Sequence, residues 1–177
     1  QIGVKIIEVA TRFLGLHETA SNAAWDNPET AGEDQAAKDL LAALEATGWQ
    51  RGWAYCIAMT EATWRTAYAE AGAPAALVQH ISKILTVSVM QSFNNAIADQ
   101  QITRLPVLGA IFFMQKGRTG FGHAGLYVKV GGQIFTTIEG NTSDPDAASN
   151  EEQEREGEGI YRKSRKLDFT PKSGLWL

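Results

Sequence analysis

The chain has 177 residues, of which 44% are hydrophobic and 20% are charged, and its formal net charge is −4 at pH 7. This length is sufficient for one domain with a sizeable core, and the composition is that of a globular protein. The acidic balance argues against nucleic-acid binding, and no apolar run is long enough to span a membrane. A single cysteine excludes an internal disulfide bond and a zinc site built from several cysteines.

Helical periodicity dominates the first hundred residues. Apolar residues at helical spacing predict three helices, over residues 2–16, 38–47 and 56–71. The polar segment 17–34 between the first two is expected to be a loop. Residues 75–101 favour further helix, although the segment 84–90 is also compatible with a strand.

Strand patterns dominate the second half. Four strands are expected, at residues 110–114, 123–130, 133–139 and 159–167. Gly131-Gly132 predicts a tight turn that places Val130 opposite Gln133, and the segments 116–122 and 144–159 are expected to be loops. Helices followed by an antiparallel meander predict a single α+β domain over residues 1–177, with N-terminal helices packed on an antiparallel β-sheet.

The only cysteine, Cys56, is expected in the first turn of the helix at 56–71. Unpaired backbone N–H groups and the positive end of the helix dipole favour a thiolate at this position. A thiolate nucleophile needs a base within reach, which directs attention to the histidines. The alternative is that Cys56 is a small buried apolar residue.

The hairpin at Gly131-Gly132 provides such a base. It brings His123, at the start of one strand, opposite residues 139–141 at the end of the next. An imidazole can take the thiol proton, while a carboxylate or amide holds its other ring nitrogen. Cys56, His123, Glu139 and Asn141 are therefore candidate catalytic residues. The alternatives are a strand-edge histidine that caps a turn, and ordinary turn chemistry at residues 139–141.

Four short segments carry a family resemblance when they are taken in order. They are Trp53-Ala54-Tyr55-Cys56, Pro106-Val107-Leu108-Gly109-Ala110-Ile111, Gly122-His123-Ala124-Gly125-Leu126-Tyr127 and Ile138-Glu139-Gly140-Asn141-Thr142. Together they resemble the cysteine, histidine-dependent amidohydrolase/peptidase (CHAP) domain, over about residues 10–166. The resemblance implies a papain-like fold and a peptidoglycan hydrolase. Such an enzyme cleaves an amide bond within the stem peptide, in the cross-bridge or at the muramoyl–alanine link.

The resemblance also assigns roles to residues. It implies that Cys56 is the nucleophile, that His123 is the general base and then the acid, and that Glu139 orients the imidazole. Asn141 would be a further polar member of the site. The backbone N–H of Cys56 would be one oxyanion donor. Tyr55 is a candidate for the second donor, with simple packing as the alternative.

Three departures from the family pattern bear on the site. Ala54-Tyr55 separates Trp53 from Cys56 where the family often has Trp-Cys, and Gly109-Ala110 stands where Gly-Asp is frequent. Gln50-Arg51-Gly52 stands where some members bind calcium through aspartates, so no calcium is expected there. The related NlpC-type peptidases have a second histidine where this chain has Glu139.

The three histidines are the remaining candidates for a metal site. A zinc site built from His17, His80 and His123 is the remaining metal alternative, although no pair of them has ligand spacing. No cofactor is expected. The acidic run 151–158 is expected to be a solvated loop.

The resemblance implies peptidoglycan as the partner of a secreted, periplasmic or cell-wall protein. Because the chain begins with glutamine, we expect a longer precursor that carried any export signal. A monomer is expected, and an immunity or inhibitor protein stays open as a partner. The alternative functions are a non-catalytic wall-binding or protein-binding module with the same fold, and a cysteine protease that acts on proteins.

Overall fold

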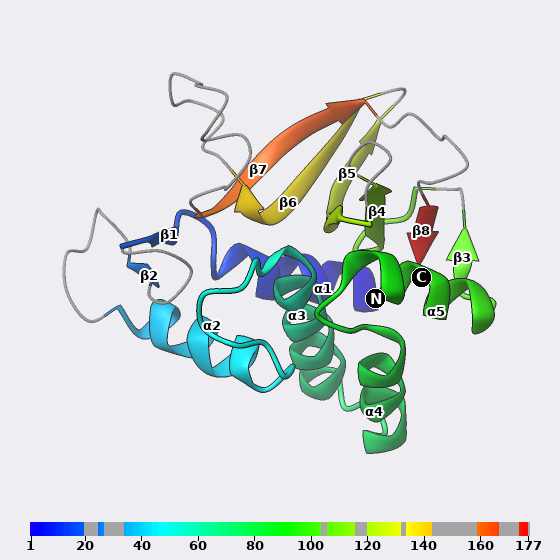
Figure 1. Cartoon of the computed structure of the whole chain (residues 1–177), viewed down its shortest axis with the longest axis horizontal. Helices are drawn as coiled ribbons and strands as arrows, with labels where there is room; N and C mark the ends of the chain where they lie inside the picture. The colour runs from blue at the N-terminus through cyan, green and yellow to red at the C-terminus, as the bar shows by residue number, and fades with distance from the viewer. Residues whose placement is uncertain are drawn as a thin grey trace.

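The computed structural model describes residues 1–19, 25–26, 34–103, 106–115, 120–131, 134–142, 159–166 and 174–176. Five helices lie within these residues: α1 (Ile2–Thr11), α2 (Gln35–Glu45), α3 (Cys56–Glu70), α4 (Ala75–Ile84) and α5 (Val89–Ala98). Figure 1 shows them gathered on one side of a curved sheet. The α+β class with helices packed against an antiparallel sheet is therefore confirmed.

The sheet has eight strands in the described residues, in the order β2-β1-β7-β6-β5-β4-β8-β3, and all of its pairs are antiparallel. The strands are β1 (His17–Glu18), β2 (Trp25–Asp26), β3 (Ile102–Thr103), β4 (Ile111–Gln115), β5 (Gly122–Gly131), β6 (Ile134–Thr142), β7 (Gly159–Lys166) and β8 (Gly174–Trp176). The expected meander is the central run from β4 to β7. The short strands extend it at both edges.

Several expected boundaries were wrong. The first helix ends at Thr11 instead of continuing to residue 16. The second begins at Gln35, because the side chain of Asp34 caps it by accepting a hydrogen bond from the N–H of Ala36. The segment 84–90 is neither a strand nor one continuous helix. α4 ends at Ile84, and α5 starts after a break because Ser88 caps its first turn.

The expected loop at 17–34 contains β1 and β2. Strands of two residues are too short to show alternation in the sequence, so no pattern predicts them. β8 lies in the segment after residue 167, for which the sequence pattern predicted no element. The expected loops lie outside the described residues at positions 116–119 and 144–158.

The register of the β5–β6 hairpin differs from the expected one. Val130 pairs with Phe135, two residues beyond the predicted partner Gln133. A β-bulge between Tyr127 and Lys129 then shifts the register by one residue. Beyond the bulge, toward His123, the pairing therefore differs from the expected register by only one residue.

Helix α3 is the central element of the helical layer. Most of its residues are buried, and it contacts α1, α2 and α4 as well as β5 and β6. Midway along it, the indole N–H of Trp64 donates to the carbonyl oxygen of Gly109 at 3.0 Å. A helix that packs against three helices and two strands has little freedom to shift. The N-terminus of α3, which begins at Cys56, is therefore held firmly against the sheet.

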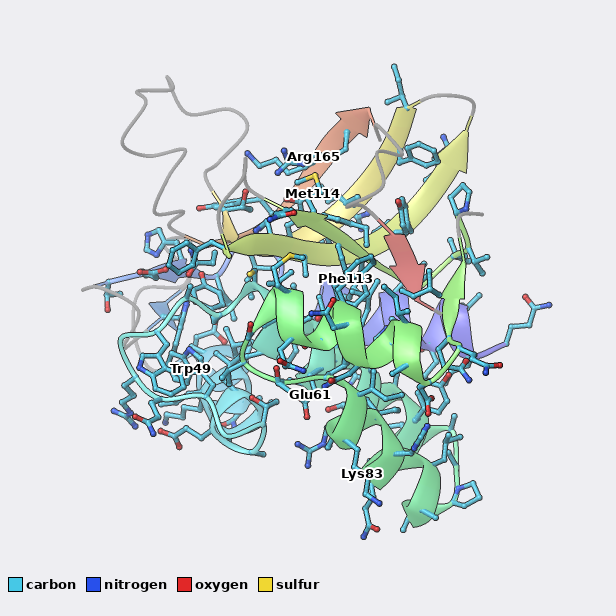
Figure 2. The ribbon with its side chains drawn as sticks, turned by 45° about the vertical axis from the view of Figure 1, so that its right-hand side comes forward. Trp49, Glu61, Lys83, Phe113, Met114 and Arg165 are labelled. Carbon is cyan, nitrogen blue, oxygen red and sulfur yellow. The ribbon has the colours of Figure 1, made fainter. Side chains whose placement is uncertain are left out.

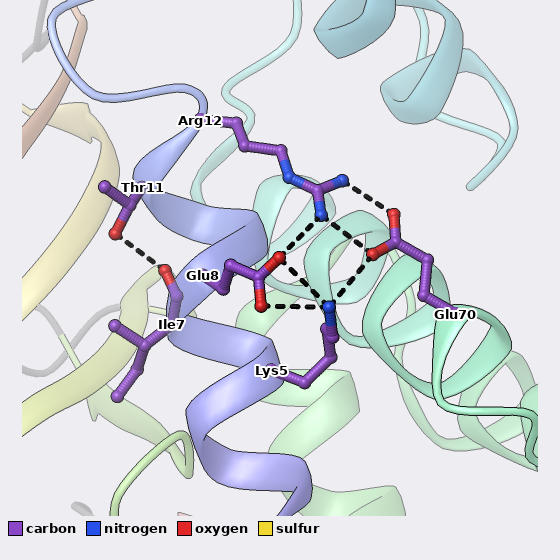
Figure 3. Close-up of polar contacts among 6 residues, drawn as sticks. All are labelled: Lys5, Ile7, Glu8, Thr11, Arg12 and Glu70. Atoms are coloured by element: carbon purple, nitrogen blue, oxygen red, sulfur yellow. Dashed lines mark hydrogen bonds and ion pairs between the residues drawn. The ribbon is translucent and has the colours of Figure 1, made fainter.

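The other end of α3 is joined to α1 by surface ion pairs (Figure 3). Arg12 contacts Glu70 at 2.6 Å, and Lys5 lies 2.9 Å from Glu8 and 3.6 Å from Glu70. These groups are largely exposed, so salt screens their attraction. Each pair therefore contributes little to stability.

Candidate active site

Cys56 is the first residue of α3, as predicted, and its side chain is only 6% exposed. Burial raises the pKa of the Cys56 thiol, but a side-chain hydrogen bond with His123 and the charge of His123 lower it. The backbone N–H groups of Ala124 and Ile57 also hydrogen-bond the sulfur and lower the pKa further. The net pKa lies below the ordinary thiol value, so the site favours a thiolate.

His123 lies on β5 and is buried beside the cysteine. Its Nε2 is 2.7 Å from Oε2 of Glu139, which leaves Nδ1 as the ring nitrogen for the thiol. Burial lowers the pKa of His123, but the hydrogen bonds and charges of Cys56 and Glu139 raise it to about 9. The two shifts act in the same direction, because each group stabilises the charged form of the other, and they favour a thiolate–imidazolium pair.

Glu139 is fully buried on β6 and is surrounded by hydrogen-bond donors. Arg165 donates from Nε to Oε1 at 2.9 Å and from Nη2 to Oε2 at 2.6 Å, and the hydroxyl of Thr137 also donates to Oε1. Burial raises the pKa of Glu139, but Arg165 and His123 lower it to about 2. These partners allow the buried carboxylate to stay ionised.

Arg165 was not among the candidate residues predicted from the sequence. β7 pairs with β6, and Arg165 is opposite Phe135, four residues from Glu139 along the strand. Alternation along β7 places Tyr161, Lys163 and Arg165 on one face, but it does not reveal which β6 residue an arginine on that face can reach. The long side chain of Arg165 spans that separation.

Gly125 makes room for this arrangement. A Cβ atom at this position would lie 2.6 Å from the ring of Phe112 and 2.7 Å from Cγ of Glu139. Both distances are far below van der Waals contact. The second glycine of the Gly-His-Ala-Gly segment therefore lets the Glu139 side chain lie flat across β5.

Asn141 contacts the backbone before α3, whereas the other three candidate residues contact one another. Its Oδ1 accepts a hydrogen bond from the N–H of Tyr55 at 3.2 Å, directly before Cys56. Its φ of +55° lies in the left-handed region, which asparagine tolerates better than most residues. The structure thus brings Cys56, His123 and Glu139 into one series of contacts, and it places Asn141 at the start of α3.

Tyr55 packs instead of facing the groove. Its side chain is fully buried, and its ring meets Trp25 edge-on at a centroid distance of 5.1 Å. Its backbone N–H is already used by Asn141. The alternative of packing therefore describes Tyr55 better than the role of oxyanion donor does.

A groove of about 300 Å³ opens beside Cys56. Trp53, which is 43% exposed, and Phe121, which is 77% exposed, line it together with small and apolar residues. Another part of its lining comes from the break between α4 and α5, where the hydroxyl of Ser92 bonds the backbone of Thr86 and Ser88. The thiol is thus reachable from a groove that has exposed aromatic residues and a firmly held wall.

The three histidines do not converge. His80 contacts Asp99 at 2.8 Å between α4 and α5, whereas His17 lies on β1. In the part of the chain that the structure describes, no three His, Cys, Asp or Glu side chains form a group that could hold a metal ion. Among the same residues, no helix has the length and apolar character needed to cross a membrane.

The arrangement has a definite chemical capacity. A thiolate at a helix N-terminus can attack an electrophilic carbon, and an adjacent imidazolium can protonate a leaving group. The N–H of Cys56 belongs to the first turn of α3, where backbone donors have no partner within the helix. Such a donor can stabilise negative charge that develops on a carbonyl oxygen.

Comparisons of this chain with protein-family models, with curated proteins and with solved structures give no match.

Proposed function

We propose that this protein is a papain-like cysteine hydrolase that cleaves an amide bond of peptidoglycan. The observation that carries the proposal is the buried series Cys56, His123 and Glu139, in which the thiol pKa is lowered and the imidazole pKa is raised. A structural cysteine in a core has no need of such a partner. This series supports nucleophilic catalysis.

The reaction has two steps. The Cys56 sulfur bonds to the carbonyl carbon, the imidazolium of His123 gives its proton to the amide nitrogen, and the C–N bond breaks to release an amine. A water molecule then attacks the thioester while His123 takes its proton. The carboxylic acid leaves and the thiol is restored. Glu139 holds the ring and balances its positive charge throughout.

The choice of peptidoglycan rests on the sequence. Three of the four segments that resemble the CHAP domain supply Cys56, His123, Glu139 and Asn141, in that order along the chain. The groove of about 300 Å³ beside the thiol presents the exposed side chains of Trp53 and Phe121 to a substrate. With this substrate the protein acts in the periplasm or at the cell wall.

The test is a digest of purified sacculi of several wall types with the wild-type protein, with Cys56→Ala and with Glu45→Gln. Glu45 is exposed, and its ion-pair partner among the described residues is the exposed Arg51, so Glu45→Gln controls for nonspecific effects of substitution. Mass spectrometry of the fragments names the bond. A free lactyl group indicates an amidase, and a free amine in the stem or bridge indicates an endopeptidase.

The expected result is fragment release by the wild-type protein and the control variant, but not by Cys56→Ala. Release that survives Cys56→Ala would exclude the proposed nucleophile. If no sacculus is cut, the proposal fails in favour of a wall-binding or protein-binding module. Cleavage of proteins without cleavage of sacculi would select a cysteine protease.

A further inference from the structure

A second cavity lies in the helical layer, between α3, α4 and the end of α2. Its volume is about 430 Å³, which is within the range of small-molecule sites. The polar side chains that line it come from Thr47, Glu61, Arg65, Gln79, Ser82 and Lys83. It shares no lining residue with the groove at Cys56. Figure 2 shows Glu61 and Lys83 among the helices, and Arg165 of the candidate active site at the sheet.

Glu61 is the unusual residue of this cavity. Its side chain is 2% exposed, and its Oε2 is buried with no hydrogen-bond partner among the described residues. Its Oε1 lies 3.5 Å from Nη1 of Arg65. Burial raises the pKa of Glu61 to about 7, although a hydrogen bond with Ser82 and the charge of Arg65 lower it. A buried acceptor without a donor is rare in folded proteins and marks a position that a ligand donor can fill.

The charges of the lining limit what that ligand can be. Arg65 already uses one of its hydrogen-bond donors within the protein, because its Nη1 donates to the carbonyl oxygen of Ala46 at 2.6 Å. Lys83, in the last turn of α4, is exposed and adds a second positive charge. A ligand with only a cationic group would be repelled by the positive charges of Arg65 and Lys83. A ligand with only an anionic group would be repelled by Glu61. A ligand that carries both groups complements the cavity.

We propose that this cavity binds a zwitterionic α-amino acid or short peptide with free termini. The ammonium group donates to Oε2 of Glu61. The carboxylate lies toward Lys83 and Arg65. This binding does not depend on the proposed hydrolysis, because it involves other residues and no covalent step.

The test is an NMR titration of the ¹⁵N-labelled full chain with the dipeptide L-alanyl-L-alanine. The matched probes are the N-acetylated dipeptide, which lacks the ammonium group, and the dipeptide amide, which lacks the carboxylate. The same titrations are made with Glu61→Gln, which keeps the shape of the side chain, and with Glu45→Gln as an exposed control. Lys83→Ala tests the carboxylate end if Glu61→Gln does not fold.

The expected result is saturable shifts of the amides of Glu61, Gln79 and Ser82 with the dipeptide. Each blocked probe and each cavity variant should bind about tenfold more weakly or worse, because a charge-assisted hydrogen bond is lost. Glu45→Gln should bind as the wild type does. Equal binding of the blocked probes would overturn the proposal. It would also be overturned by shifts confined to residues 53–56 and 87–89, or by the absence of saturable shifts.

Discussion

The guanidinium of Arg165 donates two hydrogen bonds to the carboxylate of Glu139, at 2.9 and 2.6 Å, and the same carboxylate contacts Nε2 of His123. Glu139 thus lies between a permanent cation on β7 and a titratable one on β5. Because Glu139 is fully buried, it stays ionised only with such partners. The charge of the imidazole beside Cys56 therefore depends on a strand that contributes no other candidate residue.

Replacement of Arg165 by alanine should destabilise the protein at neutral pH. The substitution leaves the buried carboxylate of Glu139 with fewer partners. We expect the free energy of unfolding to fall by about 2 kcal/mol. This is less than for a fully buried pair, because the side chain of Arg165 is about one-third exposed. The pKa of Glu139 is lowered from 4.5 to about 2, so this stability is complete above pH 4.5 and is lost as the pH falls toward 2.

Urea unfolding of the wild type and of Arg165→Ala at neutral pH and at about pH 3 measures this dependence. The difference in the free energy of unfolding between the two proteins should shrink at the lower pH. Arg51→Ala is the control, because Arg51 makes an exposed pair with Glu45 and should have little effect at either pH. The same loss for Arg165→Ala at both pH values would contradict the ionised Glu139.

Asn141→Ala should weaken the start of α3 without changing the thiol. The substitution removes the acceptor for the N–H of Tyr55 and puts alanine at a φ of +55°, so we expect a loss of about 2 kcal/mol. Asn141→Gly removes only the acceptor and should recover about half of that loss. Thermal unfolding measures both. Equal losses would exclude backbone strain, and a changed thiol pKa would mean that Asn141 acts directly on the cysteine–histidine pair.

Gly125→Ala should damage the site more than the fold. The new Cβ would meet Phe112 and Glu139 at less than 3 Å, so one of them must move, at a cost of about 1–3 kcal/mol. Displacement of Glu139 lowers the pKa of His123 and raises that of Cys56. Gly120→Ala is the control, because among the described residues, chain neighbours aside, its Cβ would meet no atom within 4 Å. Wild-type thiol reactivity in a folded Gly125→Ala protein would contradict the proposed packing.

Local signals in the sequence predicted much of this structure. Apolar spacing located the helices, and their ends differ where a side-chain cap such as Asp34 or Ser88 overrides periodicity. The hairpin brought His123 near Glu139, although the expected register missed the bulge after Tyr127. Cys56 was placed at a helix start from its neighbours alone. These are all features in which residues close in the sequence determine the result.

Features that depend on distant residues could not be predicted in this way. Arg165 is 26 residues from Glu139, and their contact depends on the β6–β7 register and on the length of an arginine side chain. The two-residue strands β1, β2 and β3 form only because a neighbouring strand offers hydrogen bonds. Asn141 looked like a partner for His123 because the hairpin put the two side by side, yet its conformation turns its amide to Tyr55.

The most direct measurement is the rate of alkylation of Cys56 by iodoacetamide as a function of pH. With the thiol pKa lowered and the pKa of His123 at about 9, the rate should show a plateau around neutral pH and rise again near pH 9, when the imidazolium loses its proton. His123→Ala should abolish the plateau, and Glu139→Gln should move the second rise to lower pH. A single rise near the free-thiol pKa of about 8.5 in all three proteins would contradict an activated thiolate at Cys56.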